Sequence, residues 1–289
     1  MKNEQLLAEI RKLRRKEIVG YSLLVIGIIG MIAFFVTGMS IFYLALGSFV
    51  VMFVGTVIAS KYSNAIKGRL GSEIVTDVLR EVLDDVRYDP FGHLPDQKIR
   101  DAHMVFPFNY DRIKGSDHIT AVYKGTDVEM SDIELCQVEY SIDSDGDTDE
   151  TEHTVFSGQW IECRLARELT GEIHISPNTK KLNKQLRNER LLVGNDLFNE
   201  RFLVVADSAD EAYSILDPRM TDAILSVAER NGGELYMSFV RDGLHIAVNT
   251  EYDFFERDGW KIDLAALRQK YLGCIRWFTD IIDELSLAE

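Results

Sequence analysis

The sequence predicts an α+β cytosolic domain preceded by an N-terminal two-helix transmembrane hairpin. Three observations support this fold class. Residues 18–60 contain no Asp, Glu, Lys, Arg or His. Between about residues 110 and 250, short apolar runs alternate with turn signals, a pattern typical of strands. The last segment, residues 263–285, has the apolar spacing of an amphipathic helix.

The uncharged stretch divides into two arms, residues 18–37 and 41–60, each 20 residues long. At a rise of about 1.5 Å per residue, each arm would span roughly 30 Å, the thickness of the bilayer hydrocarbon. A chain inside lipid must satisfy its own backbone hydrogen bonds, so both arms should be helical. A cleaved signal peptide has a shorter apolar core, and a second arm would not follow it directly.

The net charge of the chain, −15, conceals a division along its length. Residues 1–69 hold nine cations and three anions, a sum of +6, whereas the remaining 23 cations and 44 anions sum to −21. This acidic balance argues against nucleic acid as a partner, because phosphate binding requires clustered cations.

The cations cluster on both flanks of the hairpin. By the positive-inside rule, both ends of the hairpin should face the cytoplasm, in a cytoplasmic (inner) membrane protein with two spans and both termini cytoplasmic. The lipid bilayer is therefore a predicted partner. The membrane-surface candidates are Arg11, Lys12, Arg14, Arg15, Lys16, Lys61, Lys67 and Arg69.

Small residues suggest where the two arms meet. Gly20 and Gly27 lie on one arm, and Gly47, Gly55 and Ala59 lie on the other. Small side chains allow membrane helices to approach closely, although glycine is also common in such helices for other reasons. The absence of ionisable residues from the arms favours an anchor over a transport pathway.

The domain organisation follows from these patterns. Residues 1–17 form a basic cytosolic N-terminus, and residues 18–60 form the hairpin. Residues 61–88 are predicted to form a juxtamembrane amphipathic helix, and residues 89–289 a cytosolic α+β domain. The sequence does not decide whether that domain is divided into two subdomains, at about 110–177 and 198–289.

Local signals place the elements of this domain. Ser208 and Glu211 have the spacing of a capping box, and Asp217-Pro218 should cap and begin a helix. The predicted helices are 97–104, 212–216, 219–230 and 263–285. The predicted strands are 118–123, 128–142, 154–165, 172–175, 202–205, 234–240 and 244–249. In the long strand 128–142, a break in the apolar phase predicts a bulge or burial on both faces.

An acidic turn, residues 141–152, has the carboxylate spacing of a calcium loop. The candidate ligands are Asp143, Asp145, Asp147 and Glu152. Two features oppose a calcium site: the first ligand position is Ser141, and the flanks are strands, whereas an EF-hand requires helices. A solvated hairpin loop is the alternative.

No catalytic motif is present. The chain has no P-loop, no G-x-G-x-x-G, no G-x-S-x-G and no H-E-x-x-H, and its six histidines lack metal-ligand spacing. The three cysteines, Cys136, Cys163 and Cys274, form no C-x-x-C pair and should be reduced, buried side chains. We therefore predict no catalytic residue and no cofactor other than the calcium alternative.

Four short motifs, in this order, resemble the bacterial domain-of-unknown-function 3137 family. They are Tyr123-Lys124-Gly125, Phe156-Ser157-Gly158, residues 212–220 (AYSILDPRM) and residues 236–239 (YMSF). With the two N-terminal membrane helices, the resemblance extends from Ile18 to about Phe255. The acidic turn departs from the family pattern. The resemblance implies no activity, but it suggests a LemA-type membrane protein as a partner.

These patterns leave three functional hypotheses. The leading one is a membrane-anchored cytosolic binding or scaffolding module. The second is an enzyme with an unrecognised site, acting on an envelope or lipid substrate, which would require a polar pocket with shifted pKa values. The third is a calcium-responsive protein that acts through residues 141–152.

Overall fold

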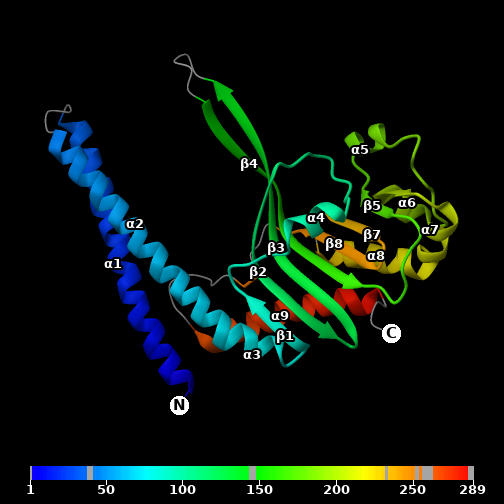
Figure 1. Ribbon diagram of the computed structural model, residues 1–289, viewed down its shortest axis with the longest axis horizontal. Coiled ribbons are helices and arrows are strands. Elements are labelled where there is room, and N and C mark those ends of the chain that lie inside the picture. The colour runs from blue at the N-terminus through cyan, green and yellow to red at the C-terminus, as the bar shows by residue number, and fades with distance from the viewer. Residues whose placement is uncertain are drawn as a thin grey trace. The chain divides into compact units, whose positions relative to one another are not determined.

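The computed structural model describes residues 2–37, 42–142, 148–231, 234–250, 254–255 and 263–285. Met1–Val75 and Thr76–Glu289 form two compact units, and each is described by itself. The first unit is an antiparallel helix pair, and the second is an α+β domain built on one antiparallel sheet (Figure 1). The predicted fold class, an α+β domain after a helical hairpin, is confirmed.

The first unit consists of α1 (Lys2–Val36), α2 (Phe42–Leu70) and one π-helical turn, η1 (Gly71–Val75). Both helices are longer than the apolar arms, because each continues through its charged flank. Glycines bring the two helices together: a methyl group on Gly20 would collide with the backbone of Ala59, and one on Gly55 with that of Leu24. Gly27 packs similarly, but Gly47 has nothing within 4 Å and takes no part.

The second unit carries a single eight-stranded sheet with the strand order β1-β2-β3-β4-β8-β7-β5-β6. All its described pairings are antiparallel. The strands are β1 (Asp84–Asp89), β2 (Arg112–Tyr123), β3 (Thr126–Ile142), β4 (Thr148–Arg164), β5 (Ile173–Pro177), β6 (Phe202–Ala206), β7 (Leu235–Val240) and β8 (Gly243–Asn249). Because β4 pairs with β8, and β5 lies between β7 and β6, the two segments considered as subdomains share this sheet.

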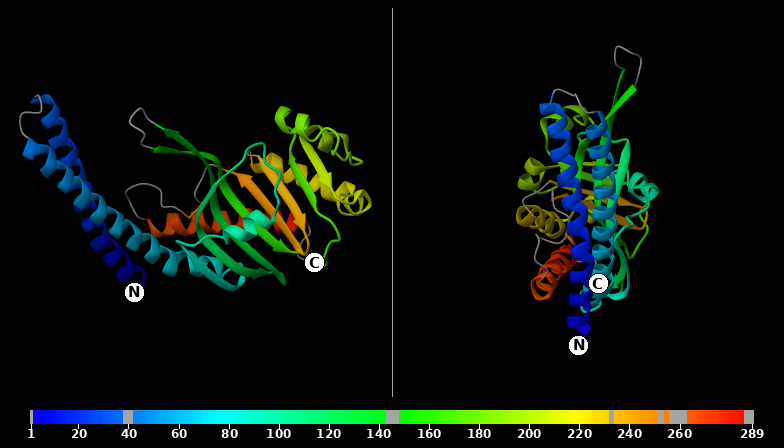
Figure 2. Two further views of the ribbon diagram at one scale, coloured as in Figure 1. Left: turned by 45° about the horizontal axis from the view of Figure 1, so that its top comes forward. Right: turned by 90° about the vertical axis from the view of Figure 1, so that its left-hand side faces the viewer.

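Helices cover both faces of the sheet, with α4 on one face and α9 on the other (Figure 2). On the α4 face, Leu94 and Ile99 pack with Phe156, Trp160 and Tyr236. The helices of this unit are α3 (Thr76–Leu79), α4 (Asp96–Asp101), α5 (Lys180–Gln185), α6 (Asp196–Arg201), α7 (Ala209–Ile215), α8 (Pro218–Asn231) and α9 (Leu264–Glu284).

Local signals placed several elements well. Ser208 accepts a hydrogen bond from the Glu211 amide at the start of α7, and Asp217 accepts one from the Met220 amide at the start of α8. Lys124 and Gly125 form the two-residue turn between β2 and β3, with φ values of 47° and 87°. Two successive positive φ values are typical of the tight turns that match strand twist.

The predicted helix over residues 61–88 is wrong at its C-terminal end. Helical structure stops at Leu79, and Asp84–Asp89 is a strand that pairs antiparallel with β2. Val82 and Val86 suit a helical period, but Val86 and Tyr88 equally suit the two-residue period of a strand. Backbone pairing with the edge of β2 decides between the two, and a short apolar run cannot reveal that edge.

The β3–β4 hairpin is longer than the strands around it. Beyond the pairing of Cys136 with Arg112, β3 has only β4 as a described neighbour, so the distal hairpin forms a two-stranded ribbon (Figure 1). The register shifts between Leu135 and Cys136 because β4 has an extra residue, Val155, so the bulge lies in β4 and not in β3. Residues 130–133 of β3 are buried in succession, which is the other predicted alternative, burial on both faces. The acidic turn therefore lies between two strands rather than two helices.

Candidate functional site

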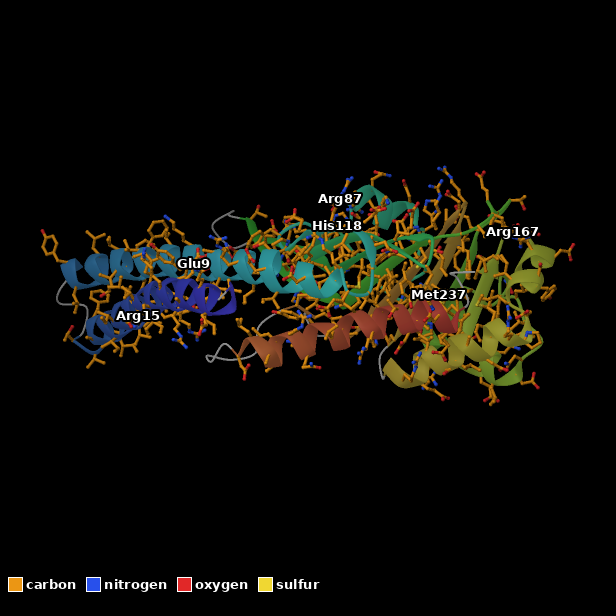
Figure 3. The ribbon with its side chains drawn as sticks, turned by 90° about the horizontal axis from the view of Figure 1, so that it is seen from below. Glu9, Arg15, Arg87, His118, Arg167 and Met237 are labelled. Atoms are coloured by element: carbon orange, nitrogen blue, oxygen red, sulfur yellow. The ribbon has the colours of Figure 1, made fainter. Side chains whose placement is uncertain are left out.

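A cleft of about 520 Å³ lies on the α4 face of the sheet, and it is lined by α4, by β1, β2, β3 and β4, and by the turn that leads into β8. Eight of its thirteen described lining residues are charged, so it offers a polar surface that does not suit an acyl chain. These eight are Asp85, Arg87, Lys98, Asp127, Glu129, Glu162, Arg164 and Asp242. Figure 3 labels Arg87 and His118, which come from the adjacent strands β1 and β2.

Lys98, Glu129 and Glu162 form an ion-pair triad at the centre of the cleft. Glu129 and Glu162 lie directly opposite each other on β3 and β4. Two like charges in this position repel. From α4, the Lys98 ammonium donates to Glu129 Oε1 at 2.7 Å and to Glu162 Oε2 at 3.0 Å, which neutralises that repulsion. His118 Nε2 lies 3.2 Å from the other oxygen of Glu129.

The environment shifts the pKa values of the two glutamates in opposite directions. Hydrogen bonds from His118 and then from Lys98 outweigh burial and lower the pKa of Glu129 to about 2. Burial dominates at Glu162 and raises its pKa, despite the hydrogen bond from Lys98. Burial also acts to lower the pKa of Lys98, but its bonds to both glutamates raise it overall. Separated carboxyl pKa values are the usual basis for dividing acid and base roles between two groups.

His245 continues the same row of side chains, because it lies opposite Glu162 on β8. It is buried, and Trp160 Nε1 donates to its Nδ1 at 3.4 Å. Burial lowers the pKa of His245 to about 4. This imidazole therefore stays neutral at physiological pH.

Sequence reasoning singled out none of the triad residues. A signal was present, because Glu129 lies between two apolar residues, Val128 and Met130, in the middle of a predicted strand. The partners could not be paired from sequence, since Lys98 is 31 residues from Glu129 and 64 from Glu162.

The distal hairpin holds a second cluster, in which donor atoms of Glu134, Cys136 and Glu152 lie within 4.8 Å of one another. Glu152 already forms ion pairs with Arg112 and Lys114. Burial and the adjacent glutamates raise the pKa of Cys136 to about 12, so its thiol keeps its proton. Hydrogen bonds from Cys136 and Thr154 to Glu134, and the ion pairs of Glu152, link the two strands of the hairpin here.

Of the calcium candidates, Asp143, Asp145 and Asp147 lie outside the described residues. Glu152 lies inside them, where its two cationic partners compete with any divalent cation. Among the cysteines, Cys136 and Cys163 are buried and Cys274 is half-buried, and all three are free thiols.

Residues 154–287 match the model of a family described as a protein of unknown function, DUF3137. This part of the chain belongs to the DUF3137 family. The match runs from within β4 to just beyond the end of α9 and includes three of the four motifs in full, whereas Tyr123-Lys124-Gly125 precedes it. The hairpin, β1, β2 and β3 lie outside it.

Two further comparisons accompany the family match. A solved structure, described as the crystal structure of the mycobacterial trehalose monomycolate transport factor A, TtfA, is 12% identical and covers 75% of this chain and 97% of that chain. Its TM-score is 0.37, a similarity that does not establish a shared fold. No curated protein matches the sequence.

The cleft joins the DUF3137 segment to the strands that precede it. Glu162, Arg164 and Asp242 come from the matched segment, whereas Lys98 and Glu129 come from outside it. The cleft therefore requires the strands before residue 154 as well as the matched family segment.

The predicted membrane-surface cations lie on the paired ends of α1 and α2. Arg69 donates from Nη2 to Glu9 Oε1 at 2.7 Å, and the Lys16 ammonium lies 5.1 Å from the centre of the Tyr62 ring. Figure 3 labels Glu9 and Arg15 on α1. The side chains of Arg11, Lys12, Arg15, Lys16, Lys61 and Arg69 are exposed, and those of Arg14 and Lys67 are half-buried. Both groups of cations thus lie at the same end of the hairpin.

Replacing Glu129 with glutamine should change the acid stability of the protein. Because the pKa of Glu129 falls from 4.5 to about 2 on folding, its contribution is complete above pH 4.5 and is lost as the pH falls toward 2. We expect Glu129→Gln to lower the free energy of unfolding at neutral pH by on the order of 2 kcal/mol, and to flatten its decline below pH 4.5. Urea unfolding followed by tryptophan fluorescence across this pH range measures both effects.

Glu139→Gln is the matched control, because Glu139 is 69% exposed and its carboxylate lies 3.7 Å from His153. It should leave the pH profile unchanged. Identical profiles for Glu129→Gln and the unmodified protein would show that the triad does not stabilise the folded domain.

Proposed function

We propose that this DUF3137 protein is a membrane-anchored binding module, whose helical hairpin spans a bilayer and whose α+β domain binds a polar ligand or partner segment in its cleft. One observation carries the proposal. Of the 22 large hydrophobic side chains exposed in the described residues, 17 lie on α1 and α2 between Ile18 and Val57. A stable soluble protein does not expose a surface of this kind to water.

The lengths and polarity of the helices agree with a spanning role. Glu4–Val36 and Tyr43–Leu79 are long and apolar enough to cross a membrane, and only 11% and 17% of their most apolar windows are buried. A core helix of a soluble protein would be mostly buried. Packing through Gly20 and Gly55 is also typical of membrane helix pairs, in which small residues permit close approach.

The charges support an orientation for the anchor. The basic ends of α1 and α2 lie together, and the positive-inside rule favours placing them in the cytoplasm. The acidic domain would then lie on the cytoplasmic side of the inner membrane. Resemblance to the family makes a LemA-type membrane protein the first partner to seek.

The composition of the cleft supports the binding role of the domain. Its three cations and five anions leave a surplus of two negative charges, which suits a cationic or hydroxyl-rich group. Lys98 already occupies the two glutamates, so a ligand amine would bind by displacing it or by contacting the outer carboxylates Asp85 and Asp127.

Site-specific photo-crosslinking in intact cells tests the proposal. A photoreactive residue at Arg87 or Arg164, both on the rim of the cleft, should give a discrete adduct in the membrane fraction. The same residue at Leu197, an exposed position outside the cleft, should give none. Fractionation that leaves the protein soluble would contradict the anchor, and membrane-bound protein without rim adducts would contradict the binding role.

An enzyme is the second candidate, favoured by the opposite pKa shifts of Glu129 and Glu162 within one cleft. If the cleft is catalytic, Glu162→Gln should trap a substrate that the unmodified enzyme turns over. Native mass spectrometry of the full-length protein from membranes can detect such a molecule. Equal occupancy in the variant and the unmodified protein would leave binding, without turnover, as the role of the cleft.

A further inference from the structure

A basic patch lies on the surface of the second unit, in the segment that connects β5 to α6. Residues 178–192 carry five cations and one anion, a sum of +4, although the charges of residues 70–289 sum to −21. We name it the α5 patch, after the helix at its start (Figure 1). The patch consists of the exposed side chains of Lys180, Lys181, Lys184, Arg187 and Leu192.

Hydrogen bonds and burial fix the backbone beneath the patch. The Leu182 amide donates to the Thr179 hydroxyl at 3.3 Å, which caps the start of α5, and the Leu182 side chain is buried. At the other end of the segment, the Leu191 amide donates to the Val204 carbonyl of β6 at 2.9 Å. The segment is therefore held at both ends, and burial of Leu182 leaves the neighbouring lysines on the exposed side of α5.

The cations of the α5 patch differ from those of the sheet in their partners. On the sheet, Arg112 forms ion pairs with Glu150 and Glu152. In the part of the chain that the structure describes, no ion pair involves any of the four cations of the α5 patch. Four like charges held close together repel one another, and the positive potential that they create attracts anions.

Leu192 distinguishes a bilayer from a soluble anion as the ligand of the patch. Its side chain is 59% exposed and lies in the same segment as the cations. A free phosphate would use the cations alone. At a bilayer surface, cations contact the headgroups while an apolar side chain enters the boundary with the acyl chains. The combination of positive charge and an exposed leucine therefore fits an anionic lipid surface.

We propose that the α5 patch docks on the anionic headgroups of the membrane into which the hairpin inserts. This docking rests on the proposed anchoring function, because the hairpin keeps the domain near the bilayer and makes a contact of low intrinsic affinity effective. The rest of the domain is acidic and is repelled by the same headgroups. Docking through the α5 patch thus selects one side of the domain to face the membrane.

Lipid contact of a fluorophore attached at Leu192→Cys tests the docking. Cys136 and Cys163 are buried, and because burial raises the pKa of each thiol to about 12, neither reacts with the label. Cys274→Ser removes the remaining thiol. The full-length protein is placed in nanodiscs whose lipids carry a quencher at the top of the acyl chains. The nanodiscs are made of phosphatidylcholine alone or of equal parts phosphatidylcholine and phosphatidylglycerol.

We expect the label to be quenched in nanodiscs that contain phosphatidylglycerol and to remain fluorescent in phosphatidylcholine alone. The Debye length falls from about 8 Å at physiological salt to about 3 Å at about 1 M, so added salt should restore the fluorescence. Replacing all four cations of the α5 patch with glutamine should abolish the quenching. A label at Asp280→Cys, an exposed acidic position on α9, should not be quenched in either kind of nanodisc.

The matched control removes the same charge from exposed positions outside the patch, by combining Arg167→Gln, Arg219→Gln, Arg241→Gln and Arg276→Gln. Its label at Leu192 should be quenched as strongly as when these four arginines are present. Protein that does not co-elute with nanodiscs would contradict the anchor, and with it this docking. If the protein co-elutes, three results would overturn the docking and leave the anchor intact: no quenching at Leu192, equal quenching in phosphatidylcholine alone, or quenching that survives loss of the patch cations.

Discussion

Lysine at both Ile29 and Phe53 is expected to release the protein from the membrane. These side chains are 60% and 63% exposed and lie near the middle of the two apolar arms. In water the double substitution would be harmless, because it replaces exposed apolar groups with charged ones. At the centre of a bilayer each lysine costs about 2.5–3.5 kcal/mol, so the pair should oppose insertion by roughly 5–7 kcal/mol.

The measurement is the share of protein that resists extraction of membranes with alkaline carbonate. Leu192→Lys combined with Leu197→Lys is the matched control, because these side chains are 59% and 69% exposed but belong to the α+β domain. The control should remain in the membrane pellet. Retention of the Ile29/Phe53 variant in that pellet would contradict a bilayer-spanning hairpin.

Gly158→Ala is expected to destabilise the α+β domain by about 3 kcal/mol. Gly158 lies on β4 opposite Asn249 of β8. A methyl group there would collide with the carbonyl oxygen of Val248 and would lie 2.8 Å from the amide nitrogen of Thr250. Both atoms belong to the backbone, so the collision can be removed only if β4 and β8 move apart. The pairing of these two strands joins the two halves of the sheet.

Gly273→Ala provides a control of opposite sign. Gly273 lies in the interior of α9, where an added methyl group meets nothing within 4 Å. Alanine should therefore stabilise the helix by roughly 0.5–1 kcal/mol. Urea unfolding followed by the fluorescence of the buried Trp160 measures both variants. If Gly158→Ala unfolds at the same urea concentration as the unmodified protein, the close approach of β8 is not required.

Prediction from sequence succeeded where a structure depends on neighbours along the chain. The caps at Ser208 and Asp217 are local, because each side chain accepts a hydrogen bond from an amide three residues further along the chain. It failed for β1, because whether residues 84–89 extend the helix or pair as a strand depends on the edge of β2. It also could not show that the segments 110–177 and 198–289 share one sheet, since strand order is set by contacts distant in sequence.

The same distinction applies to the sites. Sequence alone determined the apolar hairpin, its basic flanks and the acidic turn, because each is a continuous run whose composition reveals its physics. Only the tertiary structure brought Lys98 between Glu129 and Glu162. Each of these residues has an ordinary sequence neighbourhood. Their chemistry arises from charges and lone pairs held within about 3 Å by strand register and backbone geometry, which a linear pattern does not record.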